Sequence, residues 1–154
     1  MIDDDGTVVF DSTRILEYLD ARYEHAPLYP ASPARRAETR LLIDWFNRVW
    51  KVWPNAIQAE LRLPEPDVER IAGLGAEMTT ALDTFEALLS DREFLLGDAL
   101  GAADCVVFPF AKYAAGREEG DDELFHRVLD DFQAIGGRQR LAAWLERIGS
   151  LPRV

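Results

Sequence analysis

The chain has 154 residues, 48% hydrophobic and 29% charged, which fits one globular domain, or one domain with a fragment of another. Its 17 basic and 28 acidic residues give a net charge of −11, which argues against binding to nucleic acid or to an anionic membrane surface. A single cysteine excludes an internal disulfide and favours a cytoplasmic location, and no apolar run is long enough to span a membrane.

The first segment predicts a short strand that leads into a helix. Asp3–Gly6 is typical of a turn, and the β-branched residues 7–10 predict a strand, with no second strand signal further along the chain. Asp11 and Ser12 are capping residues, and apolar side chains recur at helical spacing after them to about Tyr23. The chain therefore begins like the end of an α/β unit whose beginning is absent.

A proline-rich linker separates this unit from the rest of the chain. Pro27, Pro30 and Pro33 disfavour both helix and central strand, and Ser32 followed by Pro33 is a typical helix start. We expect an α/β remnant over residues 1–25, a linker over 26–33 and an all-helical domain over 34–154.

Beyond the linker, the spacing of apolar residues predicts about five helices and no strands. The first runs to about Leu61, with Pro54 expected to kink or break it. The others are expected at about Asp67–Leu89, after Gly101, at about Asp122–Ala134 and around Leu141–Ile148. The predicted fold class is mainly α, a helical bundle preceded by a strand and a helix.

The helix after Gly101 is expected to be the centre of this bundle. Asp104 stands at the third helical position, where its carboxylate can reach back to the amide of Gly101. The nearly uninterrupted apolar run that follows predicts a helix buried on all sides, in which Cys105 packs in the core and is not a nucleophile.

Two features could bind a small molecule. Asp11 and Ser12 lie at a strand-to-helix turn, where free amides favour a carboxylate ligand, although most such pairs cap only their own helix. Trp50 and Trp53 are either core side chains or the wall of an apolar pocket. His25 and His126 have no ligand partners at metal spacing, so no metal site is expected.

Taken in order, these segments resemble a soluble, bacterial-type glutathione S-transferase that lacks its front end. The resemblance spans essentially the whole chain and is most specific in DDGTVVFDSTRILEYLDARYEHAPLYPASPARRAETRLLIDWFNRVW and in FLLGDALGAADCVVFPF. It implies the last strand and helix of a thioredoxin-like domain, followed by the family's all-helical C-terminal domain. Gly101 stands where Ser or Thr is usual in the capping box.

The resemblance also implies roles for individual residues. Asp11 and Ser12 match the pair that holds the γ-glutamyl end of glutathione, and Asp104 matches a buried N-capping aspartate with a folding role. The family's thiol-activating residue and its cis-proline would precede Met1, so no catalytic residue is expected in this chain.

Glutathione is then expected as co-substrate, with a small apolar electrophile, no cofactor and a homodimer. We expect little transferase activity from the chain alone. Two alternatives remain: a non-catalytic protein-interaction module with this fold, and a fragment that folds poorly.

Overall fold

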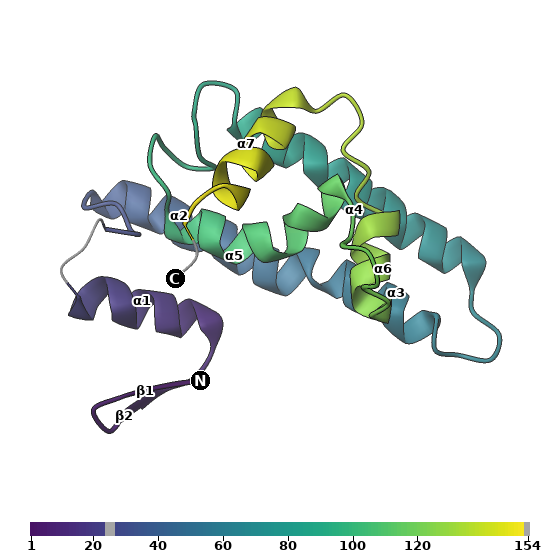
Figure 1. Ribbon diagram of the computed structural model, residues 1–154, viewed down its shortest axis with the longest axis horizontal. Helices are drawn as coiled ribbons and strands as arrows, with labels where there is room; N and C mark the ends of the chain where they lie inside the picture. Colours follow the sequence, from purple (N-terminus) through teal and green to yellow (C-terminus); the bar gives the residue numbers. More distant parts are fainter. Residues whose placement is uncertain (24–26, 153–154) are drawn as a thin grey trace.

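The computed structural model describes residues 1–23 and 27–152, and most of them are helical (Figure 1). The elements in chain order are β1 (Ile2–Asp4), β2 (Thr7–Val9), α1 (Ser12–Arg22), α2 (Pro33–Trp45), the π-helical segment η1 (Phe46–Trp50), α3 (Val52–Glu60), α4 (Val68–Leu88), α5 (Ala102–Ala111), the 3₁₀ segment η2 (Lys112–Ala115), α6 (Leu124–Asp131) and α7 (Gln139–Gly149). The expected fold, a helical bundle behind a short α/β segment, is confirmed. Within the described residues, no helix is both long and apolar enough to cross a membrane.

The N-terminal segment is a hairpin, which corrects the expectation of a single strand. β1 and β2 pair antiparallel, with Ile2 opposite Val9. Asp5 and Gly6 connect them with φ of 49° and 83°, the backbone of a two-residue hairpin turn. β1 was not predicted because two of its three residues are aspartates, which have low β-propensity. The turn at Asp5 and Gly6 sets its pairing with β2.

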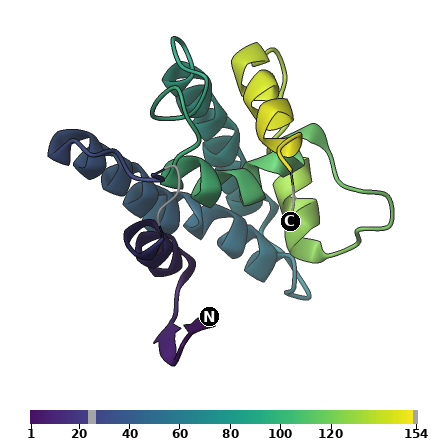
Figure 2. The same cartoon turned by 60° about the vertical axis from the view of Figure 1, so that its left-hand side comes forward.

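The hairpin extends from α1, away from the helical bundle (Figure 2). Asp4 links it to α1, because its carboxylate oxygens accept 2.8 Å hydrogen bonds from the hydroxyls of Tyr18 and Tyr23. Val8 and Phe10 lie on this extension with 47% and 63% of their surface exposed.

The long helix expected from residue 33 to 61 is broken, but before the proline and not at it. The break is η1, where the Lys51 amide bonds to the Phe46 carbonyl at 3.0 Å, five residues back. Pro54 then falls in the first turn of α3, where the amide that proline lacks would have no partner inside the helix. The wider turn thus accommodates Pro54 without a broken hydrogen bond in the helix interior.

α5 crosses the centre of the bundle (Figure 1) and contacts α1, α2 and α7. The expectation that it is buried on all sides is wrong. Ala103 and Val107 are buried, but Pro109 is exposed and Cys105 is half-buried. Cys105 and Pro109 are one turn apart and face a cavity toward α1, so one strip of this apolar helix borders open space.

Asp104 fixes the start of α5 to two other segments. Its Oδ2 accepts a 2.9 Å bond from the Gly101 amide, and its Oδ1 accepts bonds from the Leu95 amide at 2.9 Å and the Trp144 indole at 2.8 Å. Burial raises the pKa of this carboxyl above its ordinary value, while the three donors act in the opposite direction. The carboxylate therefore joins α5, the preceding loop and α7.

We expect Asp104→Ala to destabilise the protein by about 3 kcal/mol or more, because it leaves the Leu95 amide and the Trp144 indole buried without partners. Asp104→Asn should cost less, about 1–2 kcal/mol, since its carbonyl can keep both bonds and only the Gly101 contact is lost. Urea denaturation of both variants measures this order. Equal losses would contradict the assigned bonds.

Two glycines of α4 form a matched pair for a second test. A Cβ on Gly75 would overlap the Phe132 ring, whereas a Cβ on Gly73 would meet no atom within 4 Å. Gly75→Ala should therefore destabilise the fold by about 1–3 kcal/mol, and Gly73→Ala should stabilise it by about 0.5–1 kcal/mol. Thermal denaturation followed by circular dichroism gives both signs. A stabilising Gly75→Ala would mean that α6 does not approach α4 this closely.

Candidate functional site

Asp11 lies at the junction of β2 and α1 in a backbone conformation that L-residues rarely adopt. Its φ and ψ are 73° and 132°. Its carboxylate accepts hydrogen bonds from the amides of Thr13 at 2.9 Å and Arg14 at 3.2 Å, so it caps α1. Strain of this kind at a non-glycine residue is typical of functional junctions. One oxygen of the carboxylate, Oδ1, thus accepts both capping bonds.

Ser12 is the first residue of α1, and its side chain is exposed. No hydrogen bond to its hydroxyl is found within the described residues. Ser12 lines a cavity of about 380 Å³ between α1 and α5, and most of the other lining is apolar. A free hydroxyl at a helix start, beside an apolar cavity, is suited to orient a ligand with one polar end.

A second, larger cavity of about 750 Å³ lies on the other side of the junction, between α1 and α2. Its lining is mostly charged, and two of its ion pairs are Arg40–Glu17 at 3.1 Å and Arg48–Asp44 at 2.6 Å. Asn47 donates a 3.1 Å bond to the Thr13 hydroxyl. The Arg40–Glu17 and Asn47–Thr13 contacts hold α1 against α2 and η1 and so place Asp11 and Ser12 relative to the helical bundle.

Lys51 lines both cavities, and the sequence analysis did not single it out. Its ammonium lies 4.5 Å from the centre of the Phe110 ring and 5.5 Å from that of Phe46. Burial lowers the pKa of Lys51, and the charge of Asp11 partly offsets this effect. A sequence signal was present: Lys51 is one of two lysines in a strongly acidic chain.

Trp50 does not line a pocket. Its side chain has no exposed surface and stacks on Phe46 with ring centres 4.6 Å apart, so the interpretation of Trp50 as a pocket wall is corrected to a core role. The wider turn of η1 directs Trp50 inward. Trp53 is partly buried and packs edge-on against Trp45, with ring centres 6.4 Å apart.

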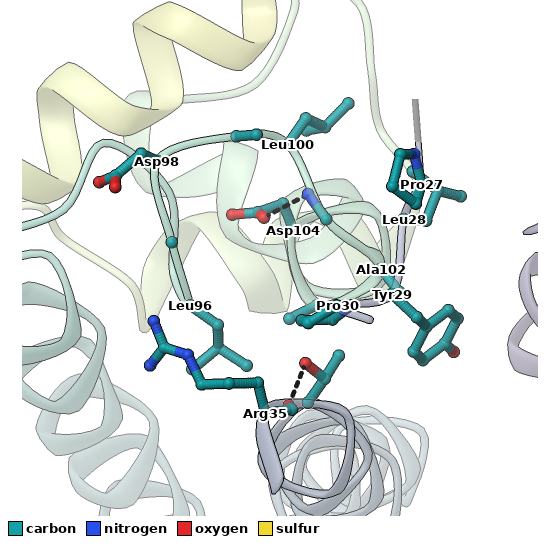
Figure 3. A pocket seen from close by; sticks show the side chains of 15 residues that line it. Pro27, Leu28, Tyr29, Pro30, Arg35, Leu96, Asp98, Leu100, Ala102 and Asp104 are labelled. Atoms are coloured by element: carbon teal, nitrogen blue, oxygen red, sulfur yellow. Dashed lines mark hydrogen bonds between the residues drawn. The ribbon is translucent and has the colours of Figure 1, made fainter. Parts of the chain in front are cut away.

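A cavity of about 270 Å³ lies between the linker and the loop before α5 (Figure 3). The Leu28 carbonyl accepts a 2.9 Å bond from the Ala102 amide, and Asp104 binds the Gly101 amide. The Tyr29 hydroxyl points away from this cavity (Figure 3), and burial raises its pKa to about 12. This region joins the linker to α5.

The remaining candidates carry no chemistry of their own. Cys105 lines the apolar cavity, but burial raises the pKa of its thiol, so the reactive thiolate is disfavoured. His126 stacks on Tyr113 and lies 2.9 Å from an Asp121 carboxylate oxygen. In the part of the chain that the structure describes, no group of three or more His, Cys, Asp or Glu is placed to hold a metal, and His25 lies outside that part.

The helical part matches a known family. The family model described as the glutathione S-transferase C-terminal domain matches residues 68–147, just over half of the chain. The chain belongs to the glutathione S-transferase family. This membership and the position of Ser12 at the start of α1 agree with the resemblance noted in the sequence.

Individual relatives support the same assignment. The chain is 29% identical to the Stringent starvation protein A homolog of Haemophilus influenzae, over 69% of this chain and 47% of that relative. It is also 29% identical to Glutathione S-transferase GstB of Escherichia coli, over 70% of this chain and 53% of that relative. The chain thus spans about half the length of these curated relatives.

Solved structures agree with the fold. A rice glutathione S-transferase in complex with glutathione superposes with a TM-score of 0.70 at 29% identity. That match covers 93% of this chain and 60% of the rice chain.

The strained cap of Asp11 predicts an unusual order of substitution effects. Asp11→Ala removes both capping bonds, and alanine, like aspartate, disfavours a positive φ. This substitution should lower the free energy of unfolding by about 1–2 kcal/mol. Asp11→Gly also loses the bonds but adopts this backbone freely, and should cost at least about 0.5 kcal/mol less. Urea denaturation compares the two. A smaller loss for alanine would show that Asp11 is not strained.

Proposed function

We propose that this chain binds the γ-glutamyl end of glutathione at Asp11 and Ser12, beside a small apolar co-substrate. The observation that carries this proposal is the exposed Ser12 hydroxyl, which has no partner within the described residues and follows the strained Asp11. The similar rice enzyme, solved in complex with glutathione, supports the choice of ligand. In this arrangement Asp11 acts mainly by fixing the first turn of α1 and directing Ser12 toward the ligand.

The proposed reaction of a complete relative is transfer of glutathione to an electrophile, or reduction with glutathione. The glutathione thiolate is the nucleophile, and an apolar pocket beside it holds the electrophile. The cavity between α1 and α5 takes the place of the pocket expected at Trp50 and Trp53. Among the described residues, no group is assigned to activate the glutathione thiol. Cys105 borders the cavity, but burial disfavours its own thiolate. We therefore propose that the chain by itself conjugates glutathione very slowly, as a cytoplasmic homodimer.

A protein-interaction role is the second candidate. The exposed side chains of Val8 and Phe10 on the hairpin favour it, because apolar side chains gathered at a projecting edge are typical of contact surfaces. The similarity to a Stringent starvation protein A homolog also supports it, since that name describes no transferase. This role and glutathione binding do not exclude each other.

We expect Ser12→Ala to weaken binding of S-methylglutathione, a non-nucleophilic analogue, by about tenfold, because one hydrogen bond to a charged group is lost. Isothermal titration calorimetry measures the affinity. Ser90→Ala, an exposed serine after α4, is the matched control and should bind as the original chain does. An unchanged affinity in Ser12→Ala would refute the site. Rapid conjugation of an aryl chloride by the purified chain would refute the slow-turnover proposal.

A further inference from the structure

Lys51 is a half-buried cation without a counter-ion. Within residues 1–23 and 27–152, no carboxylate lies within ion-pair distance of its ammonium, whereas the neighbouring cations Arg40 and Arg48 are both paired. Removing a charge from water without a partner is costly, and the two aromatic rings near Lys51 offset only part of that cost. A perturbed, unpaired charge that borders a cavity is typical of a binding site.

The acidic residue whose charge acts on Lys51 is Asp11. Asp11 attracts Lys51 electrostatically, but one of its oxygens accepts both the Thr13 and the Arg14 amide. Moving that carboxylate to Lys51 would uncap α1. Among the described residues, no carboxylate pairs with Lys51, and an anionic ligand would supply the counter-charge without disturbing the cap.

The cavity beside Lys51 has one polar end and an apolar body. α1 lines it with Ser12, Ile15 and Leu16, and α5 lines it with Cys105, Pro109 and Phe110. Its volume of about 380 Å³ falls in the range of small-molecule sites. Apolar walls with a single cation and a single hydroxyl complement a molecule that has an apolar ring and one acidic group.

We propose that this cavity binds an aromatic carboxylic acid, with its carboxylate on the Lys51 ammonium and its ring against Ile15, Leu16 and Phe110. This inference rests on the proposed function, in which the same cavity holds the co-substrate. It adds that the co-substrate is an acid. Lys51 is then a specificity-determining residue: it contacts the acidic group and takes no part in bond making.

Two sources of the carboxylate are distinguishable. Glutathione carries carboxylates of its own, and a glutathione carboxylate on Lys51 would make S-methylglutathione binding depend on Lys51. An aromatic acid would instead make naphthoate binding depend on Lys51 and leave S-methylglutathione binding unchanged. The two ligands are therefore titrated separately into the same variants.

The experiment uses 2-naphthoate and its neutral counterpart 2-naphthalenemethanol, titrated into the full chain by isothermal titration calorimetry. The variant is Lys51→Met, which keeps the length of the side chain and removes its charge. The control is Lys112→Met, because Lys112 is the other lysine and also lies over an aromatic ring, 4.9 Å from the centre of Tyr113, outside this cavity.

We expect Lys51→Met to weaken naphthoate binding roughly tenfold or more, the loss typical of a contact to a charged group. Naphthalenemethanol and S-methylglutathione should bind Lys51→Met as they bind the original chain, and Lys112→Met should leave all three affinities unchanged. Lys51→Arg should retain the preference for naphthoate over the neutral alcohol. In the original chain, added salt should weaken naphthoate binding more than alcohol binding, which tests the inference even if Lys51→Met unfolds.

Equal affinity of the original chain for naphthoate and naphthalenemethanol would overturn the inference, as would an absence of binding by both. A loss of S-methylglutathione affinity in Lys51→Met, with naphthoate unaffected, would overturn it in favour of a glutathione carboxylate. The proposed function is tested separately, by S-methylglutathione binding to the original chain and by its loss in Ser12→Ala.

Discussion

The carboxylate of Asp104 is the contact on which the rest of the helical arrangement depends. Three donors from three segments converge on it, and the site is too buried for water to replace it. Because it fixes the first turn of α5, it also fixes the direction in which Cys105, Pro109 and Phe110 face α1. The bonds of Asp104 thus determine where α5 lines the cavity toward α1.

The π-helical turn η1 is the second constraint. It accommodates Pro54 in a long helical segment and also positions Lys51 at the cavity. One extra residue in that turn rotates the following chain relative to a regular helix, so Trp50 packs inward on Phe46 while Lys51 lies over Phe110 at the cavity. The turn also places Pro54 where a missing amide costs little. A regular helix through this region could not meet both requirements.

The helix starts were predictable because each depends on local chemistry. Asp11 and Ser32 are the N-cap residues of α1 and α2, as expected, and α4 begins at Val68, close to the expected start at about Asp67. Three features were not predicted. β1 and the exposed strip of α5 depend on contacts with other segments, and η1 depends on one extra residue in a helical turn. Lys51 was missed for the same reason, since its role arises from α1 and α5, which lie far from it in the chain.

The position of α1 rests on a few polar contacts with the rest of the chain. Asp20 accepts bonds from the Leu28 and Tyr29 amides at 2.6 and 3.3 Å, and the Arg40–Glu17 pair adds a contact that is partly exposed and so contributes little. A ligand that touches both α1 and α5 would bind the docked arrangement and not an undocked one, and would stabilise it by mass action. The carboxylate of such a ligand would supply the counter-charge of Lys51 only when α1 and α5 enclose the cavity. Docking of α1 and binding of the acid would therefore be coupled.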